Sequence, residues 1–337
     1  MKDVAARAGV ATSTVSRVFS APHRISPEVR ERVEHVVREL GYTINAAAQT
    51  LRRNDTGVVM VLVPDIGNPF FSKLLKGVEH RAREFSYSVL IGDTRGDRNQ
   101  ADAYVRQLDA RRADALILLN GRVPGLRPLD QGIAPHSPDS RVYPVVVVSE
   151  RIPGTSFPTV GIDNVAAAHR ATTHLVDLGH RLIGHIAGPK DNILTGERIR
   201  GWRTALRAHG LAPSHSLVAY GDFSIASGRS AARHFLRSDP RPTAIFAAND
   251  EMAMGAVAEL KQHGLLVPAD ISIVGFDDIE FAEVYDPAIT TVRQPRFDMG
   301  RVAMSLVIQQ LRGEPFAPGE TVLPAEFVVR ASTAPAG

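Results

Sequence analysis

The 337-residue chain contains no cysteine, which excludes disulfide bonds and metal or redox sites built on thiolates. Its longest apolar runs, such as VVMVLV and VVVV, are far shorter than the roughly 20 residues that a membrane-spanning helix needs. The first residues, MKDVAARAG, lack the apolar core of a signal peptide. We therefore expect a cytoplasmic protein with no membrane partner.

The net charge is small, +3, but it is unevenly distributed along the chain. Residues 1–53 carry nine lysines and arginines against five acidic residues, and the remainder is slightly acidic. A short basic head on a long body suggests that the head binds an anion. A solvated helical face would carry the same charge, so charge alone leaves both interpretations open.

The basic head is predicted to contain three helices. The first covers Lys2–Ala8, the second runs from about Thr12 to Phe19, and the third begins after the N-cap residue Ser26 and ends at Gly41. Apolar residues on their facing sides predict a small core of Val4, Ala8, Val10, Val15, Phe19, Val29, Val33 and Leu40.

The second predicted helix has an unusual outer face. At about 100° per residue, Ser13, Ser16 and Arg17 lie together opposite the apolar side, and Thr12 lies at the N-terminal tip. Small hydroxyl side chains let a helix approach a DNA groove closely, and arginine can bind guanine through two hydrogen bonds. A short helix, a glycine-containing turn and this second helix match the helix-turn-helix arrangement.

From Val58 onward, short β-rich runs alternate with helical patterns. Nearly continuous apolar strands that alternate with helices predict parallel sheets covered on both faces. The strands are too many for one sheet, so we expect two similar α/β lobes.

Polar residues follow most of these strands. Ligands bind at the carboxyl ends of parallel strands, so two sheets that face each other would form a cleft lined by these polar residues. They are Asp65, Asp93, Glu150, Asp163, Asn164, Asp222, Asn249, Asp250, Asp277 and Asp278. Several of them, including Asn164 and Asp250, are expected instead to cap the helices that follow.

The segments DVAARAGVATSTVSRVF and ISPEVRERVEHVVRELGY resemble the DNA-binding head of the LacI/GalR family of bacterial repressors. The resemblance continues in order through VPDIGNPFFSKLLKGVE, GIDNVAAA, LGHRLIGHIAGP, FAANDEMAMGA, ISIVGFDDI and DPAITTVRQP. It implies a small all-α helix-turn-helix head followed by an α/β core of the periplasmic-binding-protein type with two parallel-sheet lobes. Within the family the motifs are most similar to those of the nucleoside-responsive branch.

The resemblance also implies the division of the chain. We expect residues 1–42 to form the DNA-binding domain and residues 43–56 the hinge helix and linker. The N-terminal lobe is expected over 57–158 and 290–322, and the C-terminal lobe over 159–289 and 323–337.

In the head, the resemblance implies that a homodimer binds palindromic double-stranded operator DNA. The implied contacts are Thr12, Ser13, Ser16, Arg17, Arg24, Tyr42, Asn45, Ala48, Leu51 and Arg52. Leu51 corresponds to a leucine inserted into the minor groove, where an apolar wedge kinks DNA. Two positions depart from the family pattern: Ala11 replaces the usual N-cap serine, and Ile44 stands where proline often precedes the hinge helix.

In the core, the resemblance implies a small effector held between the lobes, and no cofactor or metal is expected. The implied contacts are Phe70, Phe71, Asp93, Asp163, Asn192, Arg198, Phe223, Asn249 and Asp277. The aromatic residues can stack on a flat ring, and Asp277 can accept hydrogen bonds from ribose hydroxyls, so a nucleoside is favoured.

Three alternatives to a nucleoside-controlled repressor stay open: a sugar-responsive regulator of the same family, a nucleoside-hydrolysing enzyme and a solute-binding protein. The chain has no GxSxG, GxxxxGK[ST] or HExxH motif. His174, His180 and His185 have spacings that match no helical metal site and are predicted to be structural or surface residues. The sequence leaves open whether the effector induces or corepresses and whether the protein is a dimer or a tetramer.

Overall fold

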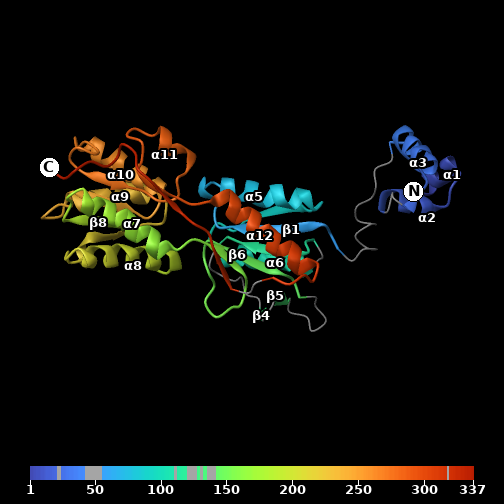
Figure 1. The fold of residues 1–337 in the computed structure, drawn as a ribbon, viewed down its shortest axis with the longest axis horizontal. Coiled ribbons are helices and arrows are strands. Elements are labelled where there is room, and N and C mark those ends of the chain that lie inside the picture. Colours follow the sequence, from blue (N-terminus) through green and yellow to red (C-terminus); the bar gives the residue numbers. More distant parts are fainter. Residues whose placement is uncertain are drawn as a thin grey trace. The chain divides into compact units, whose positions relative to one another are not determined.

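A computed structural model describes residues 1–20, 24–41, 55–109, 112–119, 127–129, 132–134, 142–316 and 319–337. The chain forms two compact units, Met1–Thr56 and Gly57–Gly337 (Figure 1). Within the described ranges, no helix combines the length and the apolar character that crossing a membrane requires.

The described part of the first unit contains the three predicted helices, α1 (Lys2–Ala8), α2 (Thr12–Ser20) and α3 (Pro27–Glu39). Gly9 ends α1 with a φ of 61°, a conformation that glycine adopts without strain. The buried core consists of Val4, Ala5, Ala8, Val15, Val18, Val33 and Val36. The prediction of Leu40 in this core is wrong: α3 ends at Glu39, and Leu40 is 38% exposed.

The second unit contains a six-stranded sheet in the order β13-β7-β6-β3-β1-β2, in which all pairs are parallel. Its strands are β1 (Val58–Val63), β2 (Ser88–Asp93), β3 (Ala115–Leu118), β6 (Val145–Val148), β7 (Thr159–Gly161) and β13 (Glu320–Val322). Side chains of β1 alternate between two layers: Val61 packs with α5 (Phe70–Glu84) and α12 (Arg296–Leu311), whereas Met60 packs with α6 (Arg98–Asp109). Helices therefore cover both faces, as the apolar strands predict.

A second parallel sheet has four strands in the order β11-β10-β8-β9. Its strands are β8 (Ile183–Ala187), β9 (Val218–Tyr220), β10 (Ala244–Ala247) and β11 (Ser272–Val274), and its helices are α7 (Asn164–Asp177), α8 (Ile193–Ala208), α9 (Ile225–Leu236) and α10 (Asp250–Gln262). Helices α7 and α8 cross at Gly201, where a Cβ atom would lie 2.4 Å from the carbonyl oxygen of Val165. Short elements complete the fold: β4 (Arg127–Leu129) pairs with β5 (Gly132–Ala134), η2 covers His215–Leu217, and α11 covers Glu280–Val284.

The chain passes repeatedly between the two sheets. Strand β12 (Thr291–Arg293) pairs antiparallel with β14 (Glu326–Val328), and both lie in these connecting segments. The predicted boundary between residues 158 and 159 differs from the observed pairing, because β7 bonds to β6 and β13 in the first sheet. The chain therefore leaves the first sheet after Gly161.

Candidate functional site

Helix α2 separates its apolar and polar sides as the sequence predicts. Val15 and Val18 are buried, Thr12, Ser13 and Arg17 are exposed, and Ser16 is half-buried. Arg24 is also exposed, just before α3. The other predicted DNA contacts lie outside the described residues: Tyr42, Asn45, Ala48, Leu51 and Arg52.

The N-terminus of α2 lacks a capping side chain. The amides of Thr14 and Val15 donate to the carbonyl oxygen of Ala11 at 2.9 and 3.1 Å, so Ala11 occupies the N-cap position. Alanine has no side-chain oxygen that could accept hydrogen bonds from the free amides of the first turn. Because Thr12 is already the first helical residue, its hydroxyl is left for another partner.

Ala11→Ser is therefore expected to stabilise α2 by about 1 kcal/mol, because serine accepts from a first-turn amide. Hydrogen exchange of the α2 amides in the full chain should slow by about fivefold, the factor that corresponds to this energy. Ala11→Val is the matched control, since valine adds a side chain without an acceptor. Equal exchange rates in the serine variant and the parent would contradict the assignment of the cap.

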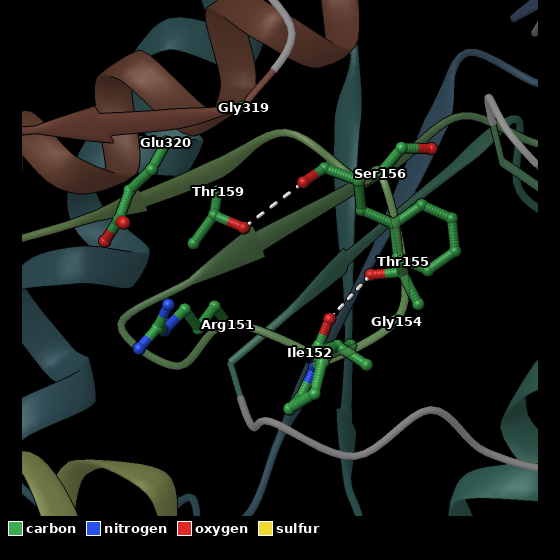
Figure 2. A pocket seen from close by; sticks show the side chains of 10 residues that line it. Arg151, Ile152, Gly154, Thr155, Ser156, Thr159, Gly319 and Glu320 are labelled. Atoms are coloured by element: carbon green, nitrogen blue, oxygen red, sulfur yellow. Dashed lines mark hydrogen bonds between the residues drawn. The ribbon is translucent and has the colours of Figure 1, made fainter.

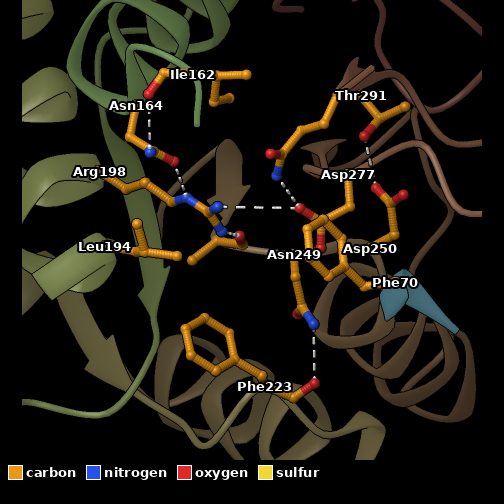
Figure 3. Close-up of polar contacts among 12 residues, drawn as sticks. Phe70, Ile162, Asn164, Leu194, Arg198, Phe223, Asn249, Asp250, Asp277 and Thr291 are labelled. Carbon is orange, nitrogen blue, oxygen red and sulfur yellow. Dashed lines mark hydrogen bonds and ion pairs between the residues drawn. The ribbon is translucent and has the colours of Figure 1, made fainter. Parts of the chain in front are cut away.

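In the second unit, Arg198 lies at the centre of a buried polar cluster (Figure 3). Its side chain is 4% exposed, and its Nε donates to Oδ1 of Asn164 at 3.1 Å. Nη1 donates to the carbonyl oxygen of Ala248, and Nη2 lies 3.9 Å from Oδ1 of Asp277. The guanidinium also lies 3.9 Å from the ring centroid of Phe276. These contacts fix both the position and the plane of the guanidinium.

Asp277 provides the opposite charge in this cluster. Its Oδ1 accepts from Nε2 of Gln294 at 2.7 Å. Burial raises the pKa of Asp277 to about 6, although the charges of Arg198 and Arg296 oppose this shift. Asp277 also has a φ of 108°, a backbone conformation that a non-glycine residue adopts only where the surroundings hold it.

Two of the three predicted aromatic residues lie close to this cluster (Figure 3). Phe70 begins α5, and its ring meets that of Phe71 edge to face at 5.1 Å, with both residues 8% exposed. Phe223 has a φ of 71°, and its ring covers Gly188 so closely that a Cβ there would lie 2.2 Å from Cζ. Figure 3 places Leu194 between Phe223 and Arg198.

Three predicted ligand contacts serve as helix caps. Asp163 accepts from the amide of Ala166 at 2.8 Å, Asn192 from that of Leu194 at 2.8 Å, and Asn249 from that of Met252 at 3.0 Å. Asn192 Nδ2 also donates to Glu150 at 2.9 Å, and Asn249 Nδ2 donates to the carbonyl oxygen of Phe223 at 2.9 Å. These three side chains hold the first turns of α7, α8 and α10, and both polar atoms of the Asn192 and Asn249 amides are already paired.

The prediction that Asn164 and Asp250 cap these helices is wrong, since each cap falls one residue earlier. Asn164 is buried and holds Arg198. Asp250 is also buried, and it accepts from Oγ1 of Thr291 at 2.6 Å and from the amide of Ile279 at 2.9 Å. Burial raises the pKa of Asp250 well above its usual range.

Asp93 is not connected to the cluster through any contact among the described residues. It ends the edge strand β2, where its Oδ1 accepts from the amide of Arg95 at 3.2 Å. Its other carboxylate oxygen lies 3.7 Å from the Arg95 guanidinium.

The sequence did not single out Arg296, although it joins the two sheets. Its Nη1 donates to the carbonyl oxygens of Pro69 and Phe70 at 3.2 and 3.3 Å, and its Nη2 donates to that of Asp278 at 2.7 Å. Arg296 is 3% exposed. The only available signal was a charged residue after the QP dipeptide, which gives no indication of burial.

A separate hollow of about 460 Å³ lies beside β7 and β13 (Figure 2). It is lined by Arg151, Ile152, Pro153, Gly154, Thr155, Ser156, Phe157, Thr159, Gly319 and Glu320. Thr155 and Thr159 donate to carbonyl oxygens of the same loop, and Arg151 pairs with Glu197 at 2.9 Å. Thr155, Thr159 and Arg151 are thus engaged within the protein.

The three histidines predicted to be structural each bond to the protein itself. His174 contacts Thr333 at 3.0 Å, His180 contacts Ala334 at 3.1 Å, and His185 contacts Phe246 at 2.9 Å. Burial lowers the pKa of His185 to about 4. In the part of the chain that the structure describes, no three histidine or acidic side chains gather as metal ligands would.

Two family models match the chain. "Bacterial regulatory proteins, lacI family" matches residues 1–45, and "Periplasmic binding protein-like domain" matches residues 172–333. The HTH-type transcriptional repressor CytR of Escherichia coli (strain K12) is 37% identical over 333 residues, which cover 99% of this chain and 96% of that protein. The ribose operon repressor of the same strain is 34% identical over 317 residues, 92% of each chain.

Solved structures agree with this likeness. The lac repressor dimer bound to operator and the anti-inducer ONPF has a TM-score of 0.84 and 29% identity, with 98% of both chains covered. The complex of the transcriptional regulator CelR with cellobiose has a TM-score of 0.72 and 32% identity, again with 98% of both chains covered. The chain therefore belongs to the lacI family of bacterial regulatory proteins and is a DNA-binding transcriptional regulator with a ligand-binding core.

Proposed function

We propose that this regulator is a repressor whose affinity for operator DNA is controlled by a nucleoside bound between its two lobes. The observation that carries the ligand assignment is the Arg198–Asp277 cluster beside Phe70 and Phe223. An aromatic ring can stack on a nucleobase, and a carboxylate next to a guanidinium can bind sugar hydroxyls. Leu194 adds an apolar contact to the same space.

A sugar effector is the second candidate. It is favoured by relatives such as the ribose operon repressor and by the cellobiose complex of CelR. A free sugar would use Asp277 and Arg198 but would leave the ring faces of Phe70 and Phe223 without a flat partner. We therefore propose a nucleoside, and not a free sugar, as the effector. Hydrolysis of the nucleoside is not part of this proposal, because the relatives are regulators and Asp277 is held by Arg198 and Gln294.

In the head, we propose that Thr12, Ser13 and Arg17 read base edges and that Ser16 and Arg24 contact the DNA or its backbone. The exposed hydroxyls and guanidinium of α2 support this assignment. On the resemblance alone, Tyr42 is proposed as a further DNA contact of the head, and Asn45, Ala48, Leu51 and Arg52 as hinge contacts. Because operator DNA is the partner, we also propose a cytoplasmic location.

We propose that the protein acts as a homodimer on a palindromic operator. Leu90 and Ile91, on the edge strand β2, are 37% and 40% exposed, and Phe281 and Val284 of α11 are 58% and 79% exposed. Exposed apolar side chains on an edge strand favour pairing with another copy. The related lac repressor is a dimer on its operator.

Selection of bound DNA from a random library, with and without cytidine, adenosine or ribose, tests this function. We expect enrichment of a palindrome whose half-sites lie about one helical turn or a multiple of it apart. Cytidine or adenosine should change the enrichment, and ribose should not. An effect of ribose alone would support the sugar-responsive alternative. Enrichment of non-palindromic sites would contradict the homodimer.

A further inference from the structure

Asp277 and Asp278 are consecutive acidic residues whose carboxylates contact different groups. Asp277 faces Arg198 in the buried cluster, where its Oδ1 lies 3.9 Å from Nη2 of Arg198 (Figure 3). The Oδ2 of Asp278 accepts from Nε of Arg293 at 2.6 Å, and its Oδ1 lies 2.7 Å from Nη1 of Arg330. One residue of the pair therefore belongs to the cluster around Arg198, and the other is bound to the segments that connect the two sheets.

The backbone at this pair has a conformation that needs support. Asp277 has a φ of 108° and Asp278 a φ of 52°, and non-glycine residues keep such values only where the surrounding contacts hold them. The amide of Asp277 donates to the carbonyl oxygen of Val292 at 2.8 Å, and Nη2 of Arg296 donates to that of Asp278 at 2.7 Å. The two contacts of the Asp278 side chain add to these bonds at the same two residues.

The two arginines that bind Asp278 come from both connecting segments. Arg293 is the last residue of β12, and Arg330 follows shortly after β14. Nη1 of Arg330 also donates to the carbonyl oxygen of Ile289 at 3.0 Å. The side chains of Asp278 and Arg330 are only 10% and 12% exposed. The Asp278 carboxylate therefore joins both connecting segments at a point that is largely shielded from water.

The segment that binds Asp278 also binds Asp277. Gln294, next to Arg293, donates from its Nε2 to Oδ1 of Asp277 at 2.7 Å. Asp277 and Arg293 form a parallel β-bridge. Successive side chains of an extended segment point to opposite faces, so Arg293 contacts one acid and Gln294 the other. A shift of this segment would therefore change the contacts of both acids together.

The two carboxylates differ in how far their charge is compensated. Burial raises the pKa of Asp278, but hydrogen bonds and charges from Arg293 and Arg330 outweigh this effect and hold the pKa below its ordinary value. Burial raises the pKa of Asp277 to about 6, because the nearby cations compensate for burial only in part. Asp278 is therefore paired within the protein, whereas Asp277 would gain from a further donor such as a ligand hydroxyl.

We propose that Asp278 is a positioning residue for the effector. Its bonds to the two arginines fix the backbone of Asp277, so that the Asp277 carboxylate faces Arg198 and the ligand. The proposal rests on the effector function proposed above, and it adds a residue that acts on the ligand only through its neighbour. Without this anchor the unfavourable φ of Asp277 can relax, and the carboxylate loses its orientation toward Arg198.

Hydrogen exchange of the full chain, measured by NMR, tests this role without a ligand. Asp278→Asn removes the charge and keeps a side chain of nearly the same shape that tolerates a positive φ. We expect the Asp277 amide, which bonds to Val292, to exchange about tenfold faster, the factor for losing one hydrogen bond to a charged group. Amides of β10 should change much less. An unchanged Asp277 amide, or equal acceleration in β10, overturns the proposal.

Calorimetry with cytidine and with ribose tests the consequence for the ligand. We expect Asp278→Asn to weaken the binding of whichever probe the parent binds by about tenfold. Glu326→Gln is the matched control, because Glu326 is the exposed second partner of Arg293, at 3.0 Å from its Nη1. This variant removes a carboxylate from the same arginine and leaves Asp278 in place, so the affinity should stay within about twofold of the parental value.

A second variant and the pattern of outcomes keep the test decisive. Arg330→Met removes one anchor from the other side, and it should give the same faster exchange and weaker binding if Asp278→Asn does not fold. If the parent binds only ribose, the nucleoside function fails, and the ribose affinities still test Asp278. If the parent binds neither probe, the proposed ligand class fails, and exchange of the Asp277 amide alone decides whether Asp278 holds this residue. If the parent and the folded variants bind a probe equally well, the inference fails alone.

Discussion

Arg198→Met is expected to abolish effector binding and to lower the free energy of unfolding by about 3–5 kcal/mol, because it removes one partner of a buried ion pair. Asp277 would remain buried without the charge of Arg198, with only that of Arg296 left to stabilise it, and the acceptors on Asn164 and Ala248 would lose their donors. Unsatisfied buried polar groups of this kind are costly. Urea unfolding measured at pH 8 gives the loss directly, since Asp277 is then ionised in the folded parent.

Arg200→Met is the matched control, because Arg200 is exposed on the same helix and has no side-chain partner to lose among the described residues. Its free energy of unfolding should change by less than about 0.5 kcal/mol. A second test removes both charges. Arg198→Met with Asp277→Leu should recover part of the lost stability, because the orphaned carboxylate is gone. If the Arg198 and Arg200 variants were equally stable, the buried cluster around Arg198 would not stabilise the fold.

The repeating pattern of apolar residues was enough to predict both α/β sheets and the three helices of the head. The strand Val58–Val63 is buried along most of its length, which matches the prediction of a sheet covered on both faces. Gly9 ends α1 where the sequence places a helix stop, because a φ of 61° favours glycine over other residues. Such local rules succeed where a few neighbouring residues determine the conformation.

The N-caps of α7 and α10 could not be predicted from neighbouring residues alone. Asp163 and Asn164 are neighbours with similar capping propensity, and so are Asn249 and Asp250. The sequence cannot determine which member of each pair turns toward the helix. In the structure the first member caps, and the second is buried against Arg198 or Thr291. That choice depends on groups more than 30 residues away.

Arg296 and Gln294 were missed for a related reason. Their partners, Phe70 and Asp277, come from other segments of the chain, and only the crossing of β12 between the sheets brings them together. A buried arginine can be recognised only once its acceptors are known. By contrast, Arg198 and Asp277 were identified by resemblance, and the structure does bring these two together.

Arg17→Ala is expected to weaken specific operator binding by about 1–3 kcal/mol for each half-site, which is the range for a two-bond contact with guanine. A palindrome bound by a dimer would lose this energy twice. The preference for one base pair in each half-site should also relax. Quantitative gel shifts with operator and with variants at each position, at matched salt, measure both effects.

Arg38→Ala provides the control for charge. Arg38 is exposed on α3, so its removal changes the net charge of the head by the same amount without altering the outer face of α2. Any loss of affinity in that variant should be similar for all DNA sequences, whereas the Arg17 variant should lose its preference at one position. Cytidine affinity should stay at the parental value in both variants, because neither residue lies in the unit that contains Arg198. If the Arg17 variant kept its base preference, α2 would not be the recognition helix, even if the overall affinity fell.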